Sequence, residues 1–398
     1  MSDRSTSGPA GFEQITTTAK PSPYSSATKV LHAATGLFPG RRLVREVDIA
    51  PAPHSLEVYL TMRCNVACTH CYAQDRNEEY GFTDMPVEMA QRLHASIAAM
   101  GVRGMQYCGG GEPTLWRGGE VADYIAGLDL ATTRAGMASN LVLGKVLARP
   151  EVLARMTFIE AAVFAYDDAS YQAVAGGKKS HSRMEESVRA ILAVREAADL
   201  DGPKVNAKVL INNVNYQWLE QIYDWAAGVG FDNIHLRLVD DYEGKGGFTL
   251  DAEQREEFRA HLTRFSADLG LTSWQQQIGQ IMGDTNKGAN GAHTWCWTVA
   301  RGLNCWVIAN GEVYICGPQW GRQEYLIGDL RENNLEDIWG GEKHQQVARR
   351  LISNMALSGC YKTGCRHIHQ SRAIEEWADG GLPDPDPATF ETQHGWFL

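Results

Sequence analysis

Long apolar runs and clusters of basic residues are both missing from this 398-residue sequence. No stretch approaches the roughly 18 consecutive apolar residues of a membrane-spanning helix, so we expect no bilayer span. The net charge is −11, and no run of Lys or Arg could neutralise a stretch of phosphates, which argues against a nucleic-acid partner. Residues 1–26 are polar and lack the apolar segment of a signal peptide, which predicts a cytoplasmic protein.

The cysteines do not form the even set of a secreted disulfide framework. There are nine of them in a large chain without a secretion signal, so metal ligation is the better interpretation. Three lie within eight residues, Cys108 stands alone, and five lie from residue 296 onward. This division predicts two separate sites.

Length and composition predict two folded regions. Hydrophobic residues are 44% and charged residues 21% of the chain, as in a globular protein, and 398 residues exceed what one core usually organises. We therefore expect a large catalytic domain and a smaller one. We assign 1–50 to a polar leader that is ordered only if it packs on the rest, 51–250 to the large domain, 251–290 to a linker helix and loop, and 291–398 to the small domain.

From residue 56 onward, short apolar runs alternate with helical patterns, which predicts βα units and a parallel sheet. The expected strands are 56–62, 104–108, 135–139, 158–166, 205–211 and 233–239. The expected helices lie near 85–100, with Asp84 as N-cap, and near 117–127, 143–154, 183–198 and 216–228. Six units are too few for an eight-unit barrel, so the fold class is α/β with a partial (β/α)6 TIM-like barrel. Its ligands should bind at the carboxyl ends of the strands.

Two further patterns lie beyond the sixth strand. A charged helix is expected near 252–269, followed by a Gly-rich linker at 283–293. In the small domain, Asn310-Gly311 stands between two apolar runs, which predicts a β-hairpin.

The first cysteine group, Cys64-Asn-Val-Ala-Cys68-Thr-His-Cys71, directly follows the first expected strand. Three thiolates can hold a [4Fe–4S] cluster and leave one iron open to a further ligand. A structural zinc site usually closes all four positions, and this loop supplies no local fourth ligand. Zinc, or three unligated core cysteines, are the less favoured alternatives.

This loop resembles the CxxxCxφC signature of the radical S-adenosylmethionine (SAM) superfamily. The resemblance implies that Cys64, Cys68 and Cys71 bind a [4Fe–4S] cluster, that SAM chelates its open iron, and that SAM cleavage gives a 5′-deoxyadenosyl radical. It also places His70 at the φ position, near the adenine of SAM. A surface histidine is the alternative for His70.

A glycine run follows the second expected strand, at the ligand-binding end of the sheet. Gly109, Gly110, Gly111 and Glu112 precede Pro113, and three residues without side chains let a bound molecule approach the backbone. The run resembles the family's GGEP motif, which receives the SAM amino group. A structural turn is the alternative.

Two more positions resemble SAM contacts of the family. Ser139 and Asn140 follow the third strand, at the place that hydrogen-bonds the SAM ribose, although such a pair is also a common helix cap. Lys208 alternates with apolar residues on the fifth strand, so its side chain can face the barrel interior and pair with the SAM carboxylate.

The C-terminal cysteines resemble the opening motif of the SPASM and twitch domains that follow radical SAM barrels. A complete SPASM domain carries seven cysteines for two clusters, and this tail has five, so one auxiliary [4Fe–4S] cluster is the better fit. Cys305 lies on an expected strand and is the spare cysteine, and zinc remains an alternative. The expected ligands are Cys296, Cys316, Cys360 and Cys365.

The resemblance leaves the substrate open. Our leading hypothesis is hydrogen abstraction from a small-molecule substrate, a sugar or aminocyclitol-like metabolite, by a radical SAM oxidoreductase or epimerase of natural-product biosynthesis. A maturase of ribosomally made peptides is the second hypothesis. A non-catalytic iron–sulfur electron carrier is the third, but it would not need the glycine run. A reductant such as flavodoxin or ferredoxin is expected as a partner.

Two groups of residues bear on the substrate. Epimerisation needs a hydrogen donor, and Cys108 beside the glycine run is the candidate. Acids at strand ends could hold hydroxyl or amino groups of a substrate, with solvated loop acids as the alternative. These acids are Asp167, Asp168, Asp240, Asp241 and Glu243.

Overall fold

The computed structural model describes residues 26–130, 132–241, 244, 246–282, 295–354 and 366–385. Within these residues, nine strands form one sheet in the order β6-β5-β4-β3-β2-β1-β7-β8-β9. The first six are β1 (Ser55–Val58), β2 (Gly104–Tyr107), β3 (Arg134–Ser139), β4 (Met156–Val163), β5 (Lys204–Ile211) and β6 (Asn233–Leu238). They are parallel and lie close to the six expected strands, so the α/β partial barrel is confirmed.

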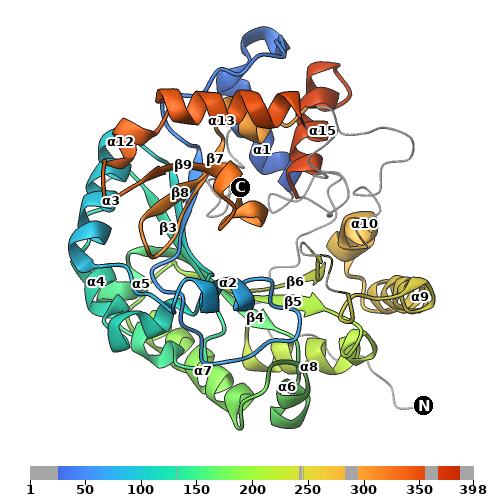
Figure 1. The fold of residues 1–398 in the computed structure, drawn as a ribbon. Coiled ribbons are helices and arrows are strands. Elements are labelled where there is room, and N and C mark those ends of the chain that lie inside the picture. The colour runs from blue at the N-terminus through green and yellow to red at the C-terminus, as the bar shows by residue number, and fades with distance from the viewer. Residues whose placement is uncertain are drawn as a thin grey trace, which may run out of the picture.

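Helices cover the outer side of the curved sheet (Figure 1). The barrel helices are α2 (Gln74–Glu79), α3 (Val87–Met100), α4 (Val121–Gly127), α5 (Pro150–Leu153), α6 (Asp168–Ala175), α7 (Ser180–Ala197) and α8 (Leu219–Val229). The later helices are α9 (Ala252–Asp268), α10 (Thr272–Ile281), α11 (Trp297–Arg301), α12 (Leu335–Ile338), α13 (Glu342–Ser353) and α15 (Arg366–Ala378). The expected helix near 252–269 is therefore confirmed as α9.

Two local helix predictions are wrong. The helix expected near 143–154 is two short pieces, the 3₁₀ helix η3 (Gly144–Leu147) and α5, because Pro150 forces Arg149 into an extended conformation and begins a new helix. Asp84 does not cap α3, whose N-cap is Pro86. Asp84 instead accepts a hydrogen bond from Thr61 at 2.6 Å.

The C-terminal hairpin is confirmed, and it joins the barrel sheet. Strands β7 (Asn304–Val307) and β8 (Glu312–Tyr314) are antiparallel, and Gly311 in the turn has φ of +97°, which glycine adopts without strain. Strand β9 (Leu326–Asp329) extends the hairpin. Strand β7 also pairs in parallel with β1, and Ser55 donates a hydrogen bond to the Asn304 side chain at 3.1 Å. The barrel and the C-terminal region therefore share one sheet.

Part of the expected polar leader is a packed helix. Residues 26–37 form α1, which lies beside α15 (Figure 1). The apolar side of α1 and Phe38 contact Trp297, Leu303 and residues of α15 in a second hydrophobic cluster. The rings of Phe38 and Trp297 are 5.0 Å apart, edge to face. This helix therefore joins the start of the chain to the C-terminal region.

Ala34→Asp should destabilise the protein, whereas Thr35→Asp on the same helix should not. Ala34 is on the side of α1 that is buried in the second hydrophobic cluster, and Thr35 is exposed. A buried, unpaired carboxylate should cost about 3 kcal/mol or more, while an exposed one should change stability by less than about 0.5 kcal/mol. Denaturant unfolding of both variants measures the difference. Equal stabilities would contradict the packing of α1.

No helix among the described residues has both the length and the apolar character needed to cross a membrane.

Candidate active site at the mouth of the barrel

The cysteine loop follows β1 and is fixed to the end of α6. The Ala67 N–H donates to the Ala175 carbonyl at 2.8 Å, and the Thr69 N–H donates to the Val174 carbonyl at 3.0 Å. The Cys71 N–H donates to the Cys68 carbonyl at 3.0 Å, which closes a turn within the loop. These backbone bonds hold the three cysteines at the carboxyl end of the barrel.

Burial dominates the electrostatics of the cysteine loop. Desolvation and neighbouring cysteine and glutamate charges raise the pKa of Cys64 to about 11, and desolvation with the same neighbours raises the pKa of Cys68. The loop itself therefore does not stabilise thiolates, and a bound metal group would have to displace the protons.

The three cysteines lie close together. They are near enough for their charges to raise the pKa of Cys64 and Cys68, as the ligands of one metal group would be. Three thiolates leave one iron of a [4Fe–4S] cluster open, whereas a structural zinc ion usually has four ligands.

The glycine run passes close behind the cysteine loop. A side chain at Gly111 would collide with the backbone of Arg63, and one at Gly110 would collide with Met62. The Gly111 N–H donates to Thr61 and the Glu112 N–H donates to Arg63, at 3.0 and 2.7 Å. Two of the three glycines are thus explained by packing, while Gly109 borders open space and leaves its backbone approachable.

Glu112 is a buried carboxylate that joins three segments. It accepts hydrogen bonds from the backbone and hydroxyl of Thr114, from the Ser139 hydroxyl at 2.6 Å and from the Asn140 N–H at 2.7 Å. Burial raises the pKa of Glu112, and these hydrogen bonds oppose the rise. Glu112 therefore holds the end of β3 against the glycine run and the 3₁₀ helix η2 (Pro113–Gly118).

Ser139 and Asn140 both organise the turn after β3. The Ser139 hydroxyl accepts from the Leu141 N–H and the Asn140 side-chain oxygen accepts from the Val142 N–H, each at 2.9 Å. The Asn140 amide also reaches Cys64, with Nδ2 3.9 Å from Sγ. Neither residue caps the next helix, η3, whose N-cap is Leu143, and Asn140 additionally lies against the cysteine loop. Their contact with the SAM ribose stays a prediction.

A cavity of about 190 Å³ opens where the barrel meets the C-terminal hairpin. Its wall is formed by apolar side chains, two acidic residues and two basic residues. The lining residues are Glu57, His70, Tyr72, Lys208, Leu210, Arg237, Leu238, Val239, Asp240, Trp306, Gly317 and Pro318. The cavity thus brings together His70 and Lys208 of the expected site and residues on both sides of the β1–β7 junction.

The histidine and the cations of the cavity have defined surroundings. His70 packs edge to face on Phe164, and burial lowers its pKa to about 4, so its ring is neutral at pH 7. Lys208 pairs with Glu160 at 2.7 Å, and Arg237 pairs with Asp240 at 2.5 Å. His70 is therefore a partly buried neutral ring rather than a free surface group.

Glu57 is a site residue that the sequence analysis did not select. It lies on β1 between Leu56 and Val58, and its carboxylate faces the cavity. The Cys108 thiol donates to it at 3.3 Å and the Tyr59 hydroxyl donates to it at 3.4 Å. Cys108 thus lies behind Glu57 and does not itself line the cavity, and its role as hydrogen donor stays a prediction.

The other expected acids have varied roles. Asp167 caps α6, and Asp168 accepts hydrogen bonds at the start of α7. Asp240 lines the cavity, and Asp241 accepts from a loop amide at 2.7 Å. Glu243 lies outside the described residues.

Two of the expected C-terminal ligands can be located. Cys296 is the N-cap residue of α11, and Cys316 follows β8 at the start of the 3₁₀ helix η5 (Gly317–Gln319). Cys305 is buried on β7, and burial raises the pKa of its thiol, which suits a core residue. Cys360 and Cys365 lie outside the described residues.

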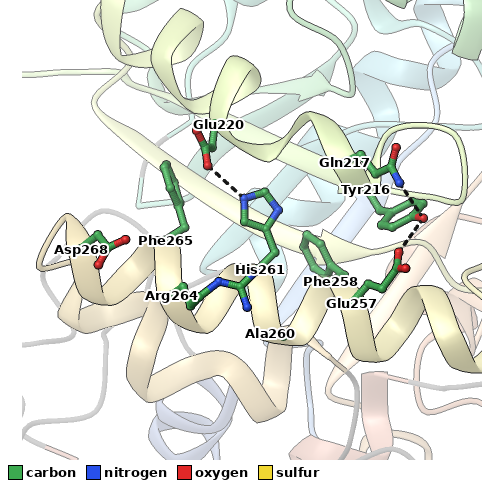
Figure 2. Close-up of a pocket in the computed structure, with 10 residues that line it drawn as sticks. All are labelled: Tyr216, Gln217, Glu220, Glu257, Phe258, Ala260, His261, Arg264, Phe265 and Asp268. Atoms are coloured by element: carbon green, nitrogen blue, oxygen red, sulfur yellow. Dashed lines mark hydrogen bonds and ion pairs between the residues drawn. The ribbon is translucent and has the colours of Figure 1, made fainter. Parts of the chain in front are cut away.

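A larger groove of about 570 Å³ lies away from these residues, between α8 and α9. Figure 2 shows two interactions across it, Tyr216 with Glu257 and His261 with Glu220. None of the expected site residues lines this groove. Volume alone therefore does not identify the active site.

Comparison with protein families gives two matches. The model of the radical SAM superfamily matches residues 58–226, and that of SPASM, an iron–sulfur cluster-binding domain, matches residues 296–366. The mycofactocin maturase MftC of Mycolicibacterium smegmatis is 24% identical, over 91% of this chain and 88% of that protein. The tungsten-containing aldehyde ferredoxin oxidoreductase cofactor-modifying protein of Pyrococcus furiosus is 22% identical, over 77% of this chain and 85% of that protein.

Two solved structures share the fold. The structure of anSMEcpe with bound AdoMet has a TM-score of 0.56 at 14% identity, over 86% of this chain and 99% of that one. The structure of Streptococcus suis SuiB bound to precursor peptide SuiA also has a TM-score of 0.56 at 14% identity, over 85% of this chain and 74% of that one.

Proposed function

Because this chain belongs to the radical SAM superfamily and carries a C-terminal SPASM domain, we propose that it is a maturase that abstracts a hydrogen atom from a peptide. Its cofactors are a [4Fe–4S] cluster, SAM and auxiliary iron–sulfur in the SPASM domain. The cluster, when bound, supplies the electron that cleaves SAM reductively. A non-catalytic electron carrier is thereby disfavoured.

The observation that carries the peptide substrate is the similarity to a maturase along nearly the whole chain. The alignment with MftC covers 91% of this chain, so it includes the C-terminal region as well as the barrel. The fold is also shared with SuiB in its complex with a precursor peptide. These findings favour the peptide hypothesis over the sugar or aminocyclitol metabolite that was the leading hypothesis from the sequence.

The cavity offers polar groups to a substrate beside SAM. Its volume of about 190 Å³ lies below the roughly 300–1,000 Å³ of pockets for whole small ligands, and His70 and Lys208, the residues expected near SAM, line it. Its volume therefore does not choose between a peptide and a small metabolite. Glu57 and the Lys208 and Arg237 pairs offer hydrogen bonds at its wall.

We assign the cofactor positions as follows. Cys64, Cys68 and Cys71 hold the cluster, and SAM lies against His70 and Asn140. The backbone of the glycine run, with Gly109 most open, borders SAM, while Glu112 and Ser139 hold this backbone in place. Lys208 already pairs with Glu160, so a SAM carboxylate would have to share it. Cys296 and Cys316, with Cys360 and Cys365, are the auxiliary ligands.

Anaerobic incubation with SAM and a strong reductant tests the substrate class. Short peptides encoded beside the gene should increase 5′-deoxyadenosine formation and change in mass, whereas sugars and aminocyclitols should do neither. Stimulation by a sugar or aminocyclitol, but by no peptide, would overturn the proposal.

A pair of variants tests whether the peptide uses the barrel cavity. Glu57→Gln should lower peptide-dependent 5′-deoxyadenosine formation by roughly tenfold or more, since a hydrogen bond to a charged group contributes about 1.5–3 kcal/mol. Glu257→Gln in the groove of Figure 2 is the matched control and should leave the rate unchanged. The opposite pattern would move the substrate to that groove.

A further inference from the structure

The cysteine loop has an inner and an outer side. His70 and Tyr72 line the cavity, whereas Arg63, Ala67 and Thr69 are exposed. An electron from outside must cross this loop to reach a cluster held by its cysteines, and electron transfer slows steeply with distance. A protein donor should therefore dock on the outer side.

Three basic residues lie beside the outer side of the cysteine loop. Ala67 bonds to Ala175, and the chain then passes through two glycines to Lys178 and Lys179, with Arg183 in the first turn of α7. All three cations are exposed, and within the described part of the chain none of them forms an ion pair. This is a local positive region on a chain whose net charge is −11.

The nearby carboxylates Asp168 and Glu186 have partners other than these cations. Asp168 reaches the same turn of α7 and accepts hydrogen bonds from the backbone and hydroxyl of Ser182, at 2.9 and 2.5 Å. Glu186, one turn beyond Arg183, pairs with Lys145 at 2.6 Å. Asp168 keeps its negative charge, but the three cations Lys178, Lys179 and Arg183 are all exposed to solvent.

An open groove of about 490 Å³ adjoins these cations, between η2, η3 and α7. Arg183 and Lys145 lie on its rim, and Leu115, Val142 and Leu143 form its apolar wall. Leu143 is 40% exposed, so this apolar wall is open to solvent. The wall follows directly after Asn140, whose amide lies 3.9 Å from the Cys64 sulfur.

We propose that this groove and the cations Lys178, Lys179 and Arg183, together called the donor face, dock an acidic one-electron carrier protein of the flavodoxin or ferredoxin class. Carboxylates of the carrier would lie over the cations, and an apolar edge near its redox group would contact Leu143. Charge complementarity of this kind mainly raises the association rate. The inference rests on the proposed function only in requiring a reducible cluster at Cys64, Cys68 and Cys71.

Comparing two reductants tests the donor face. Reduced flavodoxin must dock, whereas dithionite is a small molecule that needs no docking surface. The double variant Lys178→Glu with Arg183→Glu should raise the flavodoxin concentration for half-maximal SAM cleavage by on the order of tenfold. Its rate with dithionite should stay that of the wild type. Lys179 is left unchanged because its φ of +57° lies in the left-handed region. A substitution there could alter the backbone as well as the charge.

The matched control reverses two exposed cations elsewhere. Lys343→Glu with Arg349→Glu on α13 makes the same change in net charge and should leave both rates unchanged. The dissociation constant of the flavodoxin complex is measured by fluorescence on the cluster-loaded proteins at two salt concentrations. It should increase only in the donor-face variant and not in the α13 control. Leu143→Ser should also increase this constant, with little change in how the constant depends on salt.

Equal flavodoxin affinity and rate in the donor-face variant and the wild type would overturn the proposal, as would an equal loss in the α13 control. Absence of SAM cleavage with dithionite in the wild type would instead contradict the proposed function. The affinity measurement would still decide the docking surface in that case.

Discussion

Cys64→Ala, Cys68→Ala and Cys71→Ala are each expected to abolish SAM cleavage, because a three-cysteine site has no spare ligand. Loss of a residue that merely supports a metal ligand already costs roughly 10–100-fold, so loss of a ligand should exceed about a hundredfold. The measurements are 5′-deoxyadenosine formed with dithionite and iron bound per chain. Each variant should lose the iron of this loop and keep that of the C-terminal region.

Cys305→Ala is the control for these variants. Its side chain is buried in β7 and lies outside both assigned ligand sets. It should keep its iron and its rate of SAM cleavage. Wild-type 5′-deoxyadenosine formation in any of the three loop variants would refute the cluster assignment.

Glu112→Ala should have the second largest effect, on both stability and cleavage. The change leaves buried donors of Thr114, Ser139 and Asn140 without their acceptor. Hydrogen bonds to a charged group contribute about 1.5–3 kcal/mol each, so we expect the free energy of unfolding to fall by at least about 3 kcal/mol. Since Asn140 also contacts Cys64, cluster iron should fall with stability.

Two further variants separate the role of this carboxylate from a general effect of charge. Ser139→Ala removes one of its hydrogen bonds and should cost about 1.5–3 kcal/mol, less than Glu112→Ala. Glu120→Gln alters an exposed acid that pairs with Arg117 and should cost less than about 0.5 kcal/mol. If Glu112→Ala were as stable as Glu120→Gln, Glu112 would not be the link between the glycine run and β3.

The barrel could be predicted because its signals are local. Each strand is a short apolar run, and the cysteine loop and glycine run follow their strands at the carboxyl end, where parallel strands place their ligands. The hairpin was marked by Asn310-Gly311 in the same way. Asp84 was a plausible cap that proved to bind Thr61 instead, because a residue's nearest partner in space need not be its neighbour in sequence.

Other features depend on contacts between distant segments. The pairing of β7 with β1 has no local signature, so the C-terminal region seemed separate from the barrel. Glu57 gave one overlooked signal, a charge inside a strand with buried neighbours. Helix α1 was not predicted because polar residues precede it, although Val30, Leu31, Ala34 and Phe38 repeat at helical spacing.

The β1–β7 pairing also has a consequence for how the chain is made. Ser55 and Asn304 are 249 residues apart, so β1 leaves the ribosome long before its partner exists. At roughly 5–20 residues per second, the open edge of β1 must wait on the order of tens of seconds for β7. During that time the nascent barrel presents an unpaired strand edge, a known starting point for misassembly. Slow translation after β6, or shortage of a chaperone that shields this edge, should therefore reduce the yield of folded protein.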